Sequence, residues 1–183
     1  MGAMARMRVM GWILLLSAAG CGYRFTSRDA GLPEGVRSVC APVLRNDTAE
    51  PGLEVLFTRV LRQELVRAGV LGGTGACEAT LQGVVRSVGS GPTVIAEPSF
   101  QGDSRSAAAQ AAGYQASAVV LLRLERDGRV LAETEVSGTE DFLPGTTSVS
   151  GEVLQVEANR QAALHRLAET LMREGYDRLA SNW

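Results

Sequence analysis

The sequence predicts an α+β fold, with a mixed sheet of about four strands and two helices packed on one face. Two segments carry hydrophobic residues at helical spacing, and four others have the hydrophobic patterns of strands. These segments follow the order β-α-β-β-β-α, and the chain contains no internal repeat. Because two helices can cover only one face of such a sheet, the class is α+β rather than a doubly wound fold.

The first strand is expected at residues 36–44, where Val39, Ala41 and Val43 alternate on one face. Pro42 lies within this segment and has no N–H to donate to a neighbouring strand. Its presence indicates that the strand is near its end at this point or lies at an edge of the sheet.

The first helix follows the polar turn Asn46-Asp47-Thr48, and Pro51 suits the first turn of a helix. Its hydrophobic residues recur at helical spacing, at Leu53, Leu56, Phe57, Val60, Leu61 and Leu65. Gly69 is expected to end the helix in the usual C-terminal position of glycine. The opposite face carries charged residues, at Glu54, Arg59, Arg62 and Arg67.

The second strand is expected at residues 79–86, where Ala79, Leu81, Gly83 and Val85 alternate with more polar residues. The run Gly89-Ser90-Gly91-Pro92 is expected to break or bend this strand. Segment 97–113 consists mostly of Ser, Ala, Gln and Gly, with almost no large hydrophobic residue. We therefore expect a long loop there.

Segments 114–125 and 129–138 are expected to form a hairpin about Asp127-Gly128. An Asp-Gly pair usually indicates a two-residue turn, but that register would place Leu122 opposite Glu133. A three-residue loop instead pairs Leu124 with Val130, Leu122 with Ala132, Val120 with Thr134, and Ala118 with Val136. We therefore predict the three-residue loop, with Gly128 in a left-handed conformation.

The last helix is expected at residues 152–179, after a linker at 144–151. Its hydrophobic stripe consists of Val153, Val156, Leu164, Leu167, Ala168, Leu171 and Leu179. Gly175 lies within this segment and is expected to weaken its last turn, because glycine is a poor helix former.

The N-terminus has the pattern of a secretory signal peptide, expected at residues 1–20. Arg6 and Arg8 precede an apolar run at residues 9–19, which is shorter than the roughly 20 residues that cross a bilayer. Small residues then lead to Cys21. An ordinary cleaved signal and a degenerate transmembrane anchor are the alternatives to a lipoprotein signal.

The sequence Ala18-Ala19-Gly20-Cys21 resembles the bacterial lipobox, and this resemblance implies that Cys21 is acylated. It also implies export to the outer membrane, because Gly22 is not aspartate. More than one acyl chain gives firm anchoring. The chain is then organised as a signal peptide at 1–20, an acylated tether at 21–35 and a single domain at 36–183.

Composition argues against several classes of function. Without Arg6 and Arg8, 16 of the 18 basic residues, all arginine, stand against 20 acids, a net charge of −4. A general nucleic-acid-binding protein would show a basic excess. His165 is the only histidine, so neither a catalytic triad nor a zinc site is expected.

The acids Glu133, Glu135, Glu140 and Asp141 have the pattern of the solvated side of a strand, not of an acid/base pair. We predict a protein that is not an enzyme, with no metal site and no cofactor other than the lipid on Cys21. Cys40 and Cys77 form a disulfide or are two small buried residues, and the sequence leaves both alternatives open.

Several motifs together resemble the LPS-assembly lipoprotein family (LptE). They are Cys21-Gly22-Tyr23-Arg24-Phe25, Leu32-Pro33, Asn46-Asp47-Thr48, Pro51-Gly52-Leu53-Glu54, Leu61-Arg62-Gln63-Glu64-Leu65, residues 79–85 and residues 157–164. The likeness covers nearly the whole chain after residue 20, and the order and spacing of the motifs carry it.

The resemblance implies an outer-membrane lipoprotein that plugs the barrel of the LPS translocon, an LptD-like protein, and helps it assemble. It also implies contact with lipopolysaccharide. In the loop after the second strand only Arg105 matches the family's basic contacts, and residues 141–159 contain no basic residue. Two alternatives stay open: a lipoprotein that activates or pilots another envelope machine, such as a cell-wall synthase or a secretin, and a secreted hydrolase.

Overall fold

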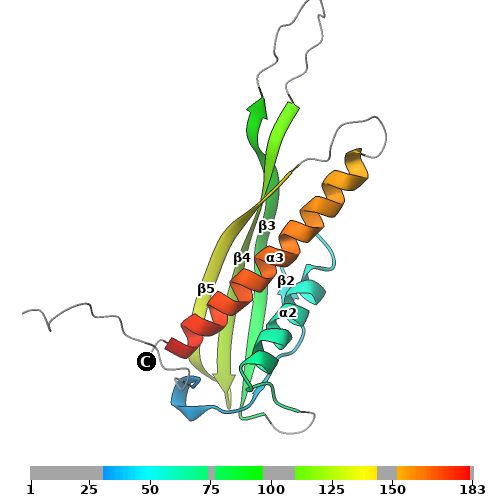
Figure 1. Cartoon of the computed structure of the whole chain (residues 1–183). Helices are drawn as coiled ribbons and strands as arrows, with labels where there is room; N and C mark the ends of the chain where they lie inside the picture. The colour runs from blue at the N-terminus through cyan, green and yellow to red at the C-terminus, as the bar shows by residue number, and fades with distance from the viewer. Residues whose placement is uncertain (1–30, 74–76, 97–109, 144–151, 182–183) are drawn as a thin grey trace, which may run out of the picture.

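Two long helices cover one face of a mixed sheet (Figure 1). The computed structural model describes residues 31–73, 77–96, 110–143 and 152–181. Its elements are η1 (Pro33–Gly35), β1 (Val39–Cys40), β2 (Arg45–Asn46), α2 (Leu53–Arg67), β3 (Ala79–Ala96), β4 (Gln110–Arg126), β5 (Arg129–Phe142) and α3 (Glu152–Ser181). The α+β class and the β-α-β-β-β-α order are confirmed. The linker expected at 144–151 lies outside the described residues.

The sheet has the order β1-β3-β4-β5, and β2 pairs with β3 farther along the same edge. Both short strands run parallel to β3, whereas β3, β4 and β5 are antiparallel neighbours. The core lies between the sheet and the helix layer. Its largest fully buried side chains include Phe57, Leu61, Leu65, Leu81, Leu122, Leu124, Leu167, Leu171 and Met172.

The first strand predicted at 36–44 is confirmed only at β1, Val39–Cys40, and its extent is wrong, because the next short strand, β2, begins beyond the predicted range at Arg45. Val39 lies opposite Ala79, and Arg45 lies opposite Val84. Between these two pairings, the segment from β1 to β2 therefore contains one residue more than β3. The extra residue reverses the alternation, and Val43 is 60% exposed while Leu44 is buried.

Side chains of α2 satisfy backbone groups in the interval between β1 and β2. The hydroxyl of Thr58 accepts a hydrogen bond of 2.9 Å from the N–H of Leu44, and Arg62 Nε donates to the carbonyl of Ala41 at 2.9 Å. Pro42 needs no partner for an N–H, since it has none. The irregular edge is therefore held by the helix rather than by the sheet.

Helix α2 buries the predicted face, but its first turn differs from the expectation. It begins at Leu53 with Gly52 as the N-cap residue, so Pro51 lies before the helix instead of in its first turn. Gly69 ends the helix as predicted, with a φ of +73°. Beyond it, the N–H of Val70 donates to the carbonyl of Leu65 at 3.0 Å.

Strand β3 confirms the inward face at Ala79, Leu81 and Val85 but not its expected break. It continues through Gly89-Ser90-Gly91-Pro92 to Ala96, with irregularities between Val85 and Ser87 and again after Pro92. Backbone pairing with β4 keeps this segment in the strand, although glycine and proline are poor strand formers. The loop predicted at 97–113 is wrong at its end, because residues 110–113 belong to β4, while 97–109 lie outside the described residues.

The hairpin between β4 and β5 has a two-residue turn, so the predicted three-residue loop is wrong. Asp127 and Gly128 both have positive φ, +52° and +78°, as a type I′ turn requires. Arg126 then pairs with Arg129. The left-handed conformation expected for Gly128 is confirmed.

A β-bulge beside this turn determines which residues of β4 and β5 lie opposite each other. Glu125 lies opposite Val130 but Leu124 lies opposite Ala132, so the register shifts by one residue. Leu122 consequently faces Thr134 and Val120 faces Val136, instead of the predicted Ala132 and Thr134. The bulge keeps the inward positions of β4 opposite the inward positions of β5 while allowing the short Asp-Gly turn.

Helix α3 confirms the predicted stripe where side chains are described. Leu164, Leu167, Ala168, Leu171 and Leu179 are buried, and Val156 packs at the edge of the core. The helix continues past Gly175 to Ser181. Among the described residues, no helix has both the length and the apolar character needed to cross a membrane.

Cys40 and Cys77 form a disulfide, which answers the alternative that the sequence left open. Their Cα atoms are 5.5 Å apart. The bond joins the end of β1 to the segment just before β3, beside the parallel pairing of Val39 with Ala79.

Candidate interaction surfaces

The reactive side chains in the described part of the chain do not converge on one point. No group of three His, Cys, Asp or Glu residues there is arranged to hold a metal ion. His165 lies on α3 with a side chain 45% exposed, and its Nδ1 is 3.7 Å from Glu169. Cys21 and Arg105 lie outside the described residues, so their roles stay predictions.

Three of the four acids of β5 form ion pairs, and the fourth, Asp141, accepts a hydrogen bond of 2.9 Å from Gln115. Glu133 is 2.5 Å from Arg123, and Glu135 is 3.6 Å from Arg86. Glu140 differs, because it reaches Arg166 of α3 at 2.7 Å. These contacts join β5 to β4, to β3 across β4, and to α3. Each of the three carboxylates therefore pairs with an arginine, and they do not form the pair of facing carboxylates expected of an acid/base site.

A hydrogen-bonded turn precedes α2 and is centred on Asn46. Asn46 Nδ2 donates to the carbonyl of Glu50 at 2.7 Å and to Glu54 Oε2 at 2.9 Å. Its Oδ1 accepts from the N–H of Thr48 at 3.0 Å. The pKa of Glu54 is lowered, first by its own backbone N–H and then by Asn46.

Arg160 of α3 connects this turn to the rest of the domain. Its guanidinium pairs with Glu50 and, at 3.2 Å, with Glu157, and it donates to Ser90 of β3 at 3.2 Å. The Arg160 side chain is only 18% exposed. The hydrogen bond to Glu50 is the main reason that the pKa of Arg160 is raised.

This network joins residues from several of the motif segments. Asn46, Thr48, Glu54 and Arg160 all belong to the segments that suggested the family, and the fold brings them into one set of contacts. Glu50 was not singled out in the sequence, and Ser90 was noted only as part of the run expected to break or bend the strand. Glu50 lies 110 positions from Arg160, and no local pattern indicates such a pairing.

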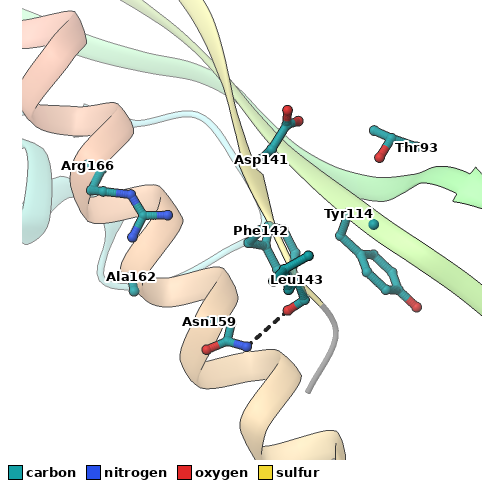
Figure 2. A pocket seen from close by; sticks show the side chains of 9 residues that line it. Thr93, Tyr114, Asp141, Phe142, Leu143, Asn159, Ala162 and Arg166 are labelled. Carbon is teal, nitrogen blue, oxygen red and sulfur yellow. Dashed lines mark hydrogen bonds between the residues drawn. The ribbon is translucent and has the colours of Figure 1, made fainter. Parts of the chain in front are cut away.

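A cleft of about 540 Å³ lies between α3 and the ends of β4 and β5 (Figure 2). Tyr114 and Phe142 stack in its wall with ring centroids 5.5 Å apart. Asn159 donates to the carbonyl of Leu143 at 3.0 Å, and Arg166 is held by Glu140. Because the walls are mainly apolar and these polar groups are engaged, the cleft suits an apolar side chain or acyl group.

A second groove, of about 530 Å³, follows the outward face of α2. It is lined by Val43, Val55, Thr58, Arg59, Arg62, Gln63 and Val66. Its three valines are 53–62% exposed. This groove is therefore both apolar and cationic, in a chain whose net charge is −2.

A protein-family model matches most of the domain. This model, described as LptE, Lipopolysaccharide-assembly, matches residues 36–179. The range runs from the chain before β1 to the last turns of α3 and includes the Asn46–Arg160 network and both grooves. No curated protein sequence matches the chain.

Solved structures are similar to this chain at low sequence identity. A Xanthomonas campestris protein of the DUF330 family is 11% identical with a TM-score of 0.51, and the match covers 81% of this chain and 88% of that one. Rare lipoprotein B from Shewanella oneidensis is 14% identical with a TM-score of 0.41, over 78% and 90% of the two chains. At this identity the first likeness concerns the fold alone.

Proposed function

The chain belongs to the LptE family of lipopolysaccharide-assembly proteins, and we propose on this premise that it is an outer-membrane lipoprotein of the LPS translocon. In this role it plugs the translocon barrel, an LptD-like protein, and helps it assemble, so that lipopolysaccharide reaches the outer leaflet. The family match over residues 36–179 is the observation that carries the proposal.

The proposed role is accessory rather than catalytic. It is supported by the family and by side chains that join structural elements, such as Arg160 between α3, β3 and the turn before α2. The two surface grooves offer places for a partner. Within the same proposal, Arg105 is a candidate contact for lipopolysaccharide.

The proposed anchor is tested by Cys21→Ala, which removes the sulfur that carries the lipid. We expect the variant to remain unprocessed or to become soluble, because the apolar run at 9–19 is too short to span a bilayer. Membrane fractionation and a gel-mobility shift for lipid measure this. Normal processing with retention in the outer membrane would contradict acylation at Cys21.

Depletion of the protein tests the proposed function directly. We expect the translocon barrel to misassemble and surface lipopolysaccharide to fall, because a barrel folded around a plug lacks part of its interior without it. The heat-dependent mobility of the barrel on gels reports assembly, and surface labelling reports lipopolysaccharide. If both stay normal, the role in another envelope machine becomes the better explanation.

A further inference from the structure

The outward face of α2 carries a stripe of exposed residues, of which the fold uses only Arg62 Nε, in its hydrogen bond to the carbonyl of Ala41. Val55, Arg59, Arg62 and Val66 follow one another at intervals of four, three and four residues, so they share one side of the helix. Val43, from the chain between β1 and β2, lies beside them in the same groove. We call these five residues the α2 stripe.

The exposed valines of the stripe have no evident role in folding. Val55 and Val66 are 53% and 62% exposed, so they contribute little to the core. Valine is also a poorer helix former than alanine or leucine, by about 0.5 kcal/mol. Val43, Val55 and Val66 line one groove, and exposed apolar side chains gathered on one surface are typical of a contact surface.

The arginines of the stripe have no carboxylate partner in the described part of the chain. Arg59 makes no ion pair there, and Arg62 uses only Nε, on the carbonyl of Ala41. The two acids of α2 are occupied, since Glu54 bonds to Asn46 and Glu64 pairs with Arg67 at 2.7 Å. The stripe thus presents guanidinium N–H groups between apolar ends and lacks the matching negative charge.

We infer that the α2 stripe docks a protein segment of the barrel partner that presents a carboxylate between small apolar side chains. The inference rests on the proposed function for the identity of that partner. A guanidinium binds a carboxylate through two parallel hydrogen bonds, and arginine is enriched among the residues that dominate protein interfaces. The valines flank the arginines and exclude water from such a pair.

Other occupants fit the stripe less well. Surfaces that adsorb to anionic membranes combine several basic residues with large apolar side chains such as Trp, Phe or Leu, whereas the stripe has two arginines and three valines. A second copy in a symmetric dimer would set arginines against arginines across the two-fold axis. Charge complementarity therefore favours an acidic protein segment.

The test places a photo-crosslinking amino acid at Val55 of the full-length lipoprotein, in cells that contain the native barrel. The amount of barrel recovered with the purified wild type is compared with the amounts recovered with Arg59→Glu/Arg62→Glu and with Arg173→Glu. Arg173 is a matched control because it is exposed on α3 and makes no ion pair among the described residues. Circular dichroism and thermal unfolding establish that each variant is folded, and Arg59→Lys/Arg62→Lys retains the positive charge if the reversal disturbs the helix.

We expect the crosslink to join Val55 to the barrel beside an Asp or Glu, as mapped by mass spectrometry. The double reversal should lower barrel recovery at least about tenfold, while Arg173→Glu leaves it unchanged and the lysine variant lowers it less. Recovery of the barrel at wild-type levels by the double reversal overturns this inference but not the proposed function. A crosslink to lipid or to a second copy also overturns the inference. If the wild-type protein recovers no barrel at all, both the inference and the proposed function are contradicted.

Discussion

Replacing both Cys40 and Cys77 by alanine is expected to lower the free energy of unfolding by about 2–4 kcal/mol. The two cysteines are 37 positions apart, so the bond closes a long loop that contains all of α2. In the unfolded chain such a closure removes many conformations, and its loss makes unfolding more favourable.

The position of the bond makes this effect large for the domain. Strand β1 has only two residues paired with β3, and on its other side Val39 alone bonds to Val70 and Gly72, so the backbone pairing of this segment is short without the covalent link. Gly72 lies against the bond as well, since a Cβ on Gly72 would be 2.4 Å from Cys77 Sγ. The disulfide thus anchors both ends of the segment that carries α2.

Urea unfolding of the domain at 36–183 measures the effect, with reductant as an internal control. The wild type in reductant should lose about as much stability as the double variant, and the double variant should not respond to reductant. A loss far below the loop-closure range, under about 0.5 kcal/mol, would show that the sheet edge and the helix packing hold this region without the bond.

Hydrophobic periodicity was sufficient to predict both helices and the inward faces of β3 and β4. In β5 the prediction is wrong at Val130, which was expected to face inward but is 44% exposed, because the bulge places it opposite Glu125. The stripes that end at Leu65 in α2 and at Leu179 in α3 are buried as expected, because amphipathic spacing directly reflects burial. The inward side of β4 at Leu122 and Leu124 was predicted for the same reason.

Register and strand breaks depend on pairing that periodicity does not encode. Alternation in β4 and β5 fixes which residues face inward, but two registers that differ by two residues have the same alternation. The bulge between Leu124 and Glu125 selects between them. In the same way, Val43 has the sequence pattern of an inward residue, and the extra residue between β1 and β2 turns it outward.

The candidate surfaces were predictable only in part. Arg59 and Arg62 were assigned correctly to the polar face of α2, but Val55 and Val66 are not distinguished from ordinary surface positions by spacing alone. The pairing of Glu50 with Arg160 depends on how α3 packs beside the turn before α2, which is a property of the tertiary structure. The family resemblance identified most members of that network without indicating their contacts.

Replacing Gly175 by leucine is expected to destabilise the domain by about 1–3 kcal/mol, although helix propensity alone predicts the opposite. In an exposed helix, leucine is about 0.8 kcal/mol more favourable than glycine. Gly175, however, is buried, and a Cβ there would lie 2.5 Å from Leu122 Cδ1 and 3.7 Å from Val136 Cγ1. Leu122 is fully buried, so it has little room to move away.

A double-mutant cycle with Leu122→Ala separates the crowding from other effects. Leu122→Ala alone should cost about 2–5 kcal/mol, because it removes a buried side chain and leaves a cavity. In Gly175→Leu/Leu122→Ala the new leucine can enter that space, so the combined loss should be smaller than the sum of the single losses by about 0.5–3 kcal/mol. Urea unfolding of the four proteins provides the values. Additive losses, or a stabilised Gly175→Leu variant, would show that α3 does not depend on glycine for its close approach to β4.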